Sequence, residues 1–281
     1  MSVWFITGAS RGFGLEIARE ALSRGDSVVA TARNPQSVLD ALPDAGDRLA
    51  AVALDVNDAA QTRAAVETAV GRFGRIDVLV NNAGRGLLGA VEEVSDEEVR
   101  AVFDVNVFGL LSVTRAVLPQ MRAQRSGLII NLSSVGGFVV WPGWGAYSAT
   151  KFAVEAFSEA MTHELAPLGI RAIAVEPGPF RTDFLDSTSL EVAAAEIDDY
   201  SASGGAARQW ATETNNAQEG DPLKAAKIIV DLESTEDLPE RIQLGTSAFN
   251  DVAAKLERTA RDQERWRDIS LSTDYATAPT S

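Results

Sequence analysis

The stretch of sequence that decides the fold is Thr7-Gly8-Ala9-Ser10-Arg11-Gly12-Phe13-Gly14. It follows a short apolar run at residues 3–6 that predicts a buried strand, and it leads into residues 15–22, where apolar side chains recur on one helical face. Glycine permits tight turns and close approach to a ligand, and the start of a helix offers unpaired N–H groups at its positive dipole end. A strand, a glycine-rich turn and a helix in this order therefore predict a pyrophosphate site.

The spacing of the glycines narrows the kind of site. Gly8, Gly12 and Gly14 follow a GxxxGxG pattern, which differs from the common GxGxxG dinucleotide fingerprint. The turn is not a P-loop, because no Gly-Lys-Ser/Thr sequence follows it. A glycine-rich turn without a ligand is the alternative, and the strand before the turn and the helix after it argue against that alternative.

Residues 27–31 predict the second strand, and Ala32-Arg33 comes directly after it. In NAD-binding units an acidic residue here holds the ribose 2′-hydroxyl, whereas a nearby arginine accommodates a 2′-phosphate. Ala32 takes the place of the acid, and Arg33 together with Arg11 supplies cations. The sequence therefore favours NADP(H), with NAD(H) as the second choice; the alternative is that both arginines are only solvated.

Further apolar runs alternate with helical patterns along the chain. Strands are expected at residues 49–54, 78–80, 128–132, 171–175 and 242–244, and helices at 58–73, 95–121, 190–197, 221–230 and 248–267, with a capping box formed by Ser95 and Glu98. This alternation predicts a Rossmann-type α/β fold, a parallel sheet of about seven strands with helices on both faces, in a single domain of residues 1–281. Ligands of such sheets bind beyond the carboxyl ends of the strands.

Tyr147 and Lys151 lie four residues apart in Tyr147-Ser148-Ala149-Thr150-Lys151. In a helix this spacing places both side chains on one face, about one turn apart. A phenol has a pKa near ~10, and a nearby ammonium group is expected to lower that pKa by favouring the phenolate. The pair could therefore move a proton, although taken alone such a spacing more often marks two residues on a helix surface.

With these motifs in place, the chain resembles the short-chain dehydrogenase/reductase family in its single-domain form. The resemblance spans residues 3–182 and rests on motifs in the family's order: the glycine-rich turn at 7–14, Asp55, Asn81-Asn82-Ala83-Gly84, Asn106, Ser134, Tyr147 with Lys151, and Pro177-Gly178 with Thr182. It implies an oxidoreductase that uses NADP(H) for reversible hydride transfer between nicotinamide and a carbonyl or secondary alcohol.

The resemblance also implies roles for single residues. Tyr147 would be the general acid or base, and Lys151 would lower its pKa and bind the nicotinamide ribose. Ser134 would orient the substrate oxygen, and Asn106 would hold a water molecule of a proton relay. The implied cofactor-binding residues are Gly8, Ser10, Arg11, Gly12, Phe13, Gly14, Arg33, Asp55, Val56, Asn82, Ala83, Gly84, Tyr147, Lys151, Pro177, Gly178 and Thr182. An ordinary strand-end hydroxyl at Ser134 and a buried phenol at Tyr147 are the alternatives.

Residues 183–220, called the lid segment below, follow the sixth strand and show a looser pattern. In the family this region covers the substrate, and such lids gate many enzymes. We expect an apolar substrate pocket here, which suits hydrophobic ketones and alcohols. Its walls are expected to be Phe184, Leu185 and Trp210 on one side and Phe138, Trp141 and Trp144 on the other. The alternative is that these aromatic residues belong to the core.

Composition excludes several classes of function. The chain has no Cys and one His, so a disulfide framework, a thiolate nucleophile and a histidine-rich metal site are excluded, and no metal is expected. The net charge of −15 argues against nucleic-acid binding. No secretory signal and no apolar run of membrane-spanning length is recognised, so a cytoplasmic protein without membrane insertion is expected.

Two alternatives to the oxidoreductase remain at this point. One is a regulator that binds the cofactor without turnover, and the other is a relative that performs epimerisation or dehydration. The family resemblance suggests a homodimer or homotetramer built through the helices around Asn106 and Tyr147. Residues 270–281 are expected to form a frayed tail.

Overall fold

The computed structural model describes residues 1–275 of the chain. Its main sheet has seven parallel strands in the order β3-β2-β1-β4-β6-β7-β9, which confirms the predicted Rossmann-type fold. The strand order reverses between β1 and β4, so a crevice opens at the carboxyl ends of these two strands. The strands are β1 (Val3–Ile6), β2 (Ser27–Ala32), β3 (Leu49–Ala53), β4 (Val78–Asn81), β6 (Gly127–Leu132), β7 (Ile170–Pro177) and β9 (Arg241–Leu244).

Successive side chains along each strand point to opposite faces of the sheet, so these apolar strands present apolar surface on both faces, and helices cover both. On β1, Trp4 and Ile6 belong to the core that includes α1, α2 and α8, whereas Phe5 belongs to the core that includes α3, α5 and α6. All three side chains are fully buried. The helices are α1 (Gly12–Ser23), α2 (Gln36–Ala41), α3 (Ala59–Phe73), α5 (Leu110–Gln124), α6 (Gly145–Leu165) and α8 (Pro222–Asp231).

The helix expected at residues 95–121 begins as predicted but is not uniform. Ser95 and Glu98 form the capping box at the start of α4 (Asp96–Phe103). A π-helical turn at Asp104–Gly109 then separates α4 from α5. Sequence periodicity does not reveal this turn, which contains Asn106 and is typical of functional sites.

The same helical run, Asp96–Gln124, is long and apolar enough to cross a membrane by length and composition. It begins with three acidic residues, and Val113, Val117 and Met121 are fully buried in the core beneath the sheet. Of its most apolar stretch of 18 residues, 44% is buried inside the protein. We therefore interpret it as a core helix of the fold.

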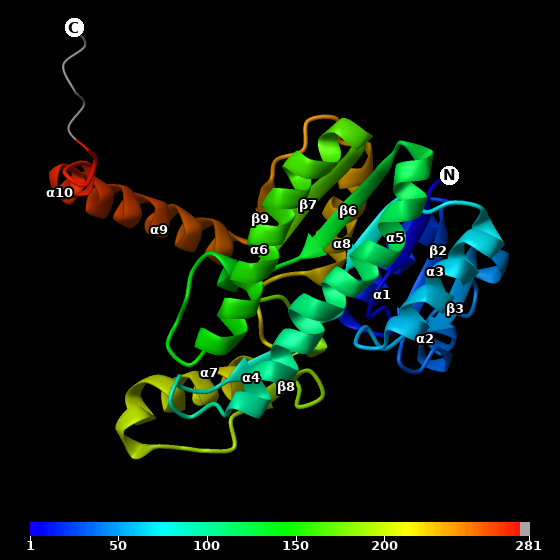
Figure 1. The fold of residues 1–281 in the computed structure, drawn as a ribbon. Coiled ribbons are helices and arrows are strands. Elements are labelled where there is room, and N and C mark those ends of the chain that lie inside the picture. The colour runs from blue at the N-terminus through cyan, green and yellow to red at the C-terminus, as the bar shows by residue number, and fades with distance from the viewer. Residues whose placement is uncertain (276–281) are drawn as a thin grey trace, which may run out of the picture.

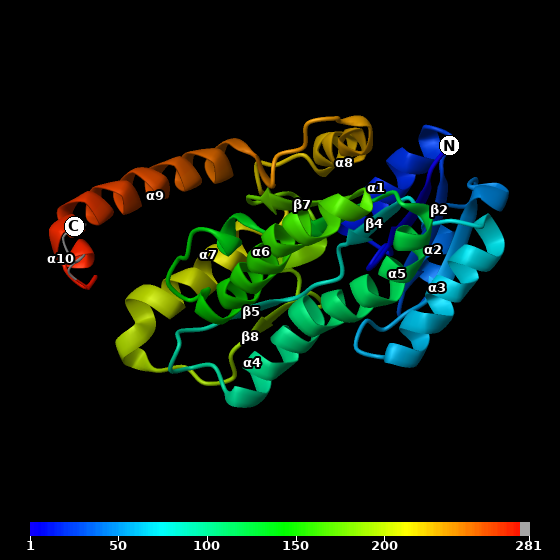
Figure 2. The same cartoon turned by 45° about the horizontal axis from the view of Figure 1, so that its top comes forward.

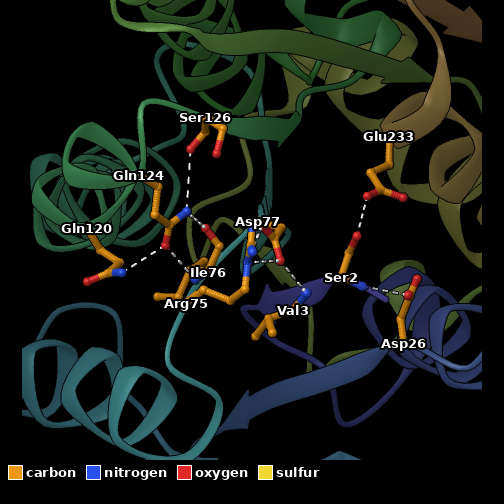
Figure 3. A network of polar contacts seen from close by, with 10 residues as sticks. All are labelled: Ser2, Val3, Asp26, Arg75, Ile76, Asp77, Gln120, Gln124, Ser126 and Glu233. Atoms are coloured by element: carbon orange, nitrogen blue, oxygen red, sulfur yellow. Dashed lines mark hydrogen bonds and ion pairs between the residues drawn. The ribbon is translucent and has the colours of Figure 1, made fainter.

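Polar side chains fix the amino ends of the strands (Figure 3). Asp26 accepts a hydrogen bond from the main-chain N–H of Ser2, and Asp77 accepts one from that of Val3, each at 2.8 Å. The side-chain amide of Gln124 forms two hydrogen bonds with the main chain of Ile76, just before β4: its oxygen accepts from the N–H, and its nitrogen donates to the carbonyl oxygen. This network lies at the edge of the sheet opposite the carboxyl ends of the strands, so we assign it to stability.

A second, two-stranded sheet lies beyond the carboxyl ends of the main strands. In it β5 (Gly86–Leu88) pairs in parallel with β8 (Leu190–Val192). The helix expected at residues 190–197 is therefore wrong: the alanines after Val192 favour a helix, but burial of Leu190 and pairing with β5 determine the structure. The lid segment also contains α7 (Ala206–Thr214), which lies near α4 and β8 at one end of the molecule (Figure 1).

The C-terminal helix α9 (Thr246–Arg265) leaves the body of the protein and carries α10 (Arg267–Leu271) at its far end (Figures 1 and 2). Its course agrees with the helix expected at residues 248–267. The expected frayed tail is wrong for Ser270 and Leu271, which belong to α10, and its last part, residues 276–281, lies outside the described residues.

Candidate functional site

The glycine-rich turn connects β1 to α1 at the crevice. Gly8 and Gly12 have φ values of +64° and +54°, a conformation that side-chain-bearing residues rarely adopt. A Cβ atom at Gly14 would lie 2.5 Å from the carbonyl oxygen of Gly8, so only glycine fits this position. No side chain caps the start of α1, and its first N–H groups therefore remain available to an anion.

Asn82 holds the turn in this shape. Its amide donates hydrogen bonds to the carbonyl oxygens of Thr7 and Gly8 at 2.9 and 3.0 Å. The hydroxyl of Thr7 in turn accepts from the main-chain N–H groups of Asn82 and Ala83, both at 2.9 Å. Residues 82–84, predicted to bind the cofactor, thus hold the turn in place and also bring Gly84 into the wall of the adjoining cavity.

The two arginines predicted to hold a 2′-phosphate differ in their surroundings. Arg33 follows β2 directly and is exposed, with no ion pair or side-chain hydrogen bond among the described residues. Arg11 instead donates hydrogen bonds to the lid segment, to the hydroxyls of Thr188 and Ser189 at 2.7 Å each. Arg33 is therefore free to meet a phosphate, whereas Arg11 connects the glycine-rich turn to the lid segment.

Asp55 and Val56 follow the carboxyl end of β3, as predicted. Asp55 is half-buried, and its carboxylate accepts a hydrogen bond from the main-chain N–H of Asn57 at 3.0 Å. Val56 is buried against Gly109 of the π-helical turn, where a Cβ atom would lie 2.6 Å from a Val56 methyl group. Both residues thus lie along the same edge of the sheet as the glycine-rich turn.

A cavity of about 560 Å³ opens at this edge, and it brings together residues from distant parts of the sequence. Ser134 follows β6, and Tyr147 and Lys151 project from the first turns of α6. Residues of three predicted cofactor motifs also line it: Phe13, Asn82, Gly84, Pro177, Gly178 and Thr182. The predicted proton-transfer group and part of the predicted cofactor site therefore share one cavity.

Burial decides the protonation of the two groups on α6. It raises the pKa of Tyr147 to about 12, and a hydrogen bond with Ser134 opposes this shift only in part. It also lowers the pKa of Lys151 to about 8, with the carboxylate of Glu155 opposing. Desolvation thus outweighs the hydrogen bond with Ser134, and the lowering of the phenol pKa by Lys151 stays a prediction. Tyr147 is protonated at neutral pH and can donate a proton.

Asn106 is buried in the π-helical turn beside α6. Its amide nitrogen donates to the carbonyl oxygen of Arg85 and to the hydroxyl of Thr150, at 2.9 and 3.0 Å. Its amide oxygen accepts from the main-chain N–H of Arg85 at 2.8 Å. Asn106 therefore fixes the chain after β4 against α6, and it does not itself line the cavity.

Aromatic side chains form the wall of the cavity around Tyr147. The ring centroids of Trp144 and Phe184 lie 5.7 and 5.4 Å from that of Tyr147. The ring centroid of Trp210 lies 6.3 Å from that of Trp144. Trp141 and Leu185 of the predicted set also lie in this wall. The wall joins the lid segment to the loop before α6, as the sequence predicts.

Phe138 is the exception in the predicted pocket. It does not line the cavity; its ring instead lies 5.2 Å from the ammonium of Lys255 on α9. It also packs on a small apolar cluster with Val135 and Val252. The sequence could not reveal this because the position of α9 relative to the loop is set by tertiary packing.

Polar contacts hold the lid segment over the cavity. Glu93, which is fully buried, accepts hydrogen bonds from the guanidinium of Arg208 on α7 and from the main-chain N–H of Ala90, each at 2.7 Å. These bonds hold the pKa of Glu93 down at about 2. Arg85, which lines the cavity, pairs with Glu191 of β8. No local pattern marks these long-range pairs in the sequence.

Comparison with known proteins agrees with this geometry. The short chain dehydrogenase family matches residues 2–193. The chain belongs to this family. An oxidoreductase, BOA17, of Botryotinia fuckeliana strain B05.10 is 38% identical over 271 residues, covering 96% of this chain and 98% of the relative. A 3-ketodihydrosphingosine reductase of Bacteroides thetaiotaomicron is 40% identical over 195 residues, covering 69% of this chain and 70% of the relative.

Solved structures give the same family and add its cofactors. A short-chain dehydrogenase from Streptomyces avermitilis matches with a TM-score of 0.91 and 40% identity, over 98% of this chain and 99% of that one. A 3-ketoacyl-(acyl-carrier-protein) reductase from Brucella melitensis, complexed with NADH, has a TM-score of 0.73 and 27% identity, over 86% and 96% of the two chains. An alcohol dehydrogenase from Thermococcus sibiricus, complexed with 5-hydroxy-NADP, has a TM-score of 0.70 and 26% identity, over 87% and 96%. This short-chain dehydrogenase is thus an oxidoreductase with a nicotinamide cofactor site.

Proposed function

We propose that this short-chain dehydrogenase is an NADP(H)-dependent reductase of apolar ketones. The observation that carries the proposal is a protonated, buried phenol, Tyr147, placed beside Ser134 in an aromatic-walled cavity that also contains part of the predicted cofactor site. A protonated phenol can donate a proton to a carbonyl oxygen, so reduction is the direction that it favours at neutral pH.

The residues present fit a nicotinamide cofactor. The glycine-rich turn would hold its pyrophosphate, while Pro177, Gly178 and Thr182 would flank its nicotinamide end in the cavity. When bound, the cofactor supplies the hydride. The protein contributes orientation and a proton source.

The proton-transfer step uses the groups around Tyr147. Ser134 and Tyr147 would hold the carbonyl oxygen of the substrate, and Tyr147 would give it the phenolic proton as the alcohol forms. Lys151, which donates a hydrogen bond to the carbonyl oxygen of Leu132 at 2.7 Å, is fixed beside the phenol and would stabilise the phenolate that remains. Alcohol oxidation would run through the same groups in reverse.

The preference for NADP(H) rests on the surroundings of β2. Ala32 occupies the position at which an acid would favour the 2′-hydroxyl, and the exposed Arg33 has no competing partner among the described residues. Arg11, which contacts the lid segment, is the weaker candidate for the 2′-phosphate.

An apolar substrate is favoured by the cavity walls. Trp141, Trp144, Phe184, Leu185 and Trp210 surround the phenol, and such walls disfavour charged or highly hydroxylated molecules. The relative named as a 3-ketodihydrosphingosine reductase acts, by its name, on a ketone of a lipid, which agrees with this substrate class.

We also propose that the protein forms homo-oligomers through the helices around Asn106 and Tyr147. Phe108 of the π-helical turn and Phe152 and Phe157 of α6 are large apolar side chains that are substantially exposed on these elements. Sedimentation or light scattering would measure the mass, and a strict monomer at micromolar concentration would contradict this assembly.

The proposed function is tested by titration of NADPH and NADH in separate experiments, followed by NADPH oxidation with a panel of apolar ketones, aldehydes and quinones. The proposal expects tighter NADPH binding and reduction of at least one apolar ketone. Cofactor binding without turnover would favour a cofactor-sensing regulator, whereas epimerisation or dehydration without net cofactor oxidation would favour the other alternative.

A further inference from the structure

The charged side chains that line the cavity differ in whether the protein already satisfies them. They are Arg85, Lys151 and Asp251. Arg85 forms an ion pair with Glu191 of β8, and Lys151 donates a hydrogen bond to the main chain of β6. Within residues 1–275, the carboxylate of Asp251 has no ion pair and no hydrogen bond. Asp251 is therefore the charge in this cavity that is left for a ligand.

The base of α9 presents Asp251 to the cavity together with Ser247, which lies one turn earlier on the same helical face. Both side chains are half-buried, and the hydroxyl of Ser247 also lacks a hydrogen-bond partner among the described residues. The first cation along α9, Lys255, donates instead to the carbonyl oxygen of Phe138. The helix thus offers two acceptor groups that no protein donor occupies.

Asp251 and the aromatic wall belong to different parts of the fold. The tryptophans of the wall come from the loop before α6 and from α7, whereas α9 packs through Val252 against Val135, directly after Ser134. Figure 1 shows α7 and α9 on different sides of the loop before α6. The cavity therefore has one apolar side and one anionic side.

The cofactor would not satisfy this carboxylate. Its phosphates are anionic and would be repelled by Asp251, and the reduced nicotinamide ring is neutral. A cofactor and a substrate that fill the cavity displace water from the carboxylate, and a carboxylate that loses water without gaining a partner is costly. An ammonium group on the substrate offsets this cost, whereas a wholly apolar ketone leaves the charge without a partner.

We propose that Asp251, together with Ser247, binds an ammonium group of the substrate, so that the preferred substrates are ketones with an apolar chain and one amino group. This inference rests on the proposed function, because it names the substrate class of the same reductase. The tryptophan wall would hold the apolar chain while Asp251 holds the ammonium group, which fixes how the carbonyl group enters. Asp251 would thus determine specificity without taking part in proton transfer.

Asp251→Asn tests the proposal because it keeps the shape of the side chain and removes its charge. The substrates are unbranched alkyl ketones of equal length, without an amino group or with one placed two, four or six carbons from the carbonyl group. The specificity constant kcat/KM is measured for each at saturating NADPH. Asp262→Asn, at an exposed position of α9, is the matched control.

The wild type should prefer at least one amino ketone over the ketone without an amino group. In Asp251→Asn the ratio of the two kcat/KM values should fall about tenfold, which corresponds to about 1.4 kcal/mol, and in Asp262→Asn it should equal that of the wild type. A wild type that prefers no amino ketone, an unchanged ratio in Asp251→Asn, or an equal loss with both kinds of ketone would overturn the proposal.

Ligand binding gives a second readout that needs no turnover. Hexylamine and hexanol are titrated into the protein saturated with NADPH, and tryptophan fluorescence is followed. Asp251→Asn should weaken hexylamine binding about tenfold and should not weaken hexanol binding. A changed ratio of NADP⁺ to NADPH affinity in this variant would place Asp251 at the nicotinamide ring instead and overturn the proposal. If the wild type oxidises NADPH with no ketone, the proposed function fails, and the hexylamine titration still decides whether Asp251 binds an ammonium group.

Discussion

The ammonium nitrogen of Lys151 lies 5.8 Å from the centroid of the Tyr147 ring, although its hydrogen bond is made to the main chain of β6. One turn of α6 brings the two residues together, and burial then moves their pKa values apart, that of the phenol upward and that of the ammonium downward. The fold therefore holds the pair in place, and the phenol of Tyr147 is neutral before a ligand enters.

Tyr147→Phe should abolish turnover and leave the cofactor site intact. The substitution removes only the phenolic oxygen, so the ring contacts with Trp144 and Phe184 are retained. Loss of a positioned general acid typically lowers kcat by about 10²–10⁴-fold. Steady-state rates and NADP⁺ titration of the same preparation check this. Full turnover in the variant would show that another group supplies the proton.

Arg33→Ala should weaken NADP⁺ binding by about tenfold and leave NAD⁺ binding unchanged, because it removes a charge-assisted contact to the 2′-phosphate. Calorimetric titration with each cofactor measures both effects, and Arg100→Ala at an exposed position of α4 is the control. Equal weakening of NADP⁺ and NAD⁺ binding would mean that Arg33 does not contact the 2′-phosphate.

Arg208→Met should destabilise the lid segment, because it leaves the carboxylate of Glu93 buried without its cation. Removal of one partner of a buried ion pair typically costs roughly 3–5 kcal/mol. Limited proteolysis should then cut within residues 183–220 faster than in the wild type. The interpretation of this pair as a clamp would be wrong if the cleavage rate did not change.

Acid should weaken the same contact. The pKa of Glu93 is lowered to about 2 by Arg208 and by main-chain N–H groups, from an ordinary value of 4.5. Its contribution to stability is therefore present above pH 4.5 and is lost as the pH falls toward 2. Urea unfolding across this range should show a smaller acid-dependent loss in Glu93→Gln, from an already lower starting stability.

Glu155→Gln should flatten the pH dependence of stability between about pH 4.5 and 7. Burial and the neighbouring Glu176 raise the pKa of Glu155 to about 7, although Arg241 lies 3.6 Å from its carboxylate. A raised carboxyl pKa means that stability is complete below 4.5 and is lost as the pH rises through 7. Glu159→Gln, an exposed partner of the same arginine, is the control. Identical pH profiles for Glu155→Gln and the wild type would contradict this.

The parts of the fold that were predictable from the sequence depend on local patterns. The strand, glycine-rich turn and helix at residues 3–22 are contiguous, and alternation along β1 sends Trp4 and Phe5 to opposite cores. Helical spacing likewise places Tyr147 and Lys151 on one face of α6. In each case the residues that interact are near one another in the chain.

The parts that were not predictable depend on contacts between distant segments. The pairing of β5 with β8 and the Glu93–Arg208 ion pair each join segments about a hundred residues apart. The pKa of Tyr147 depends on its burial in the folded protein, and a spacing rule carries no such information.

The most direct test of the account follows deuterium from the cofactor. NADPH dideuterated at nicotinamide C4 is incubated with the panel of apolar ketones, and the products are analysed by mass spectrometry. The account predicts one deuterium at the carbinol carbon of at least one product with the wild type, and none above background with Tyr147→Phe. Tight NADPH binding with no deuterium in any product, or equal transfer by both proteins, would contradict the assignment of a reductase that works through Tyr147.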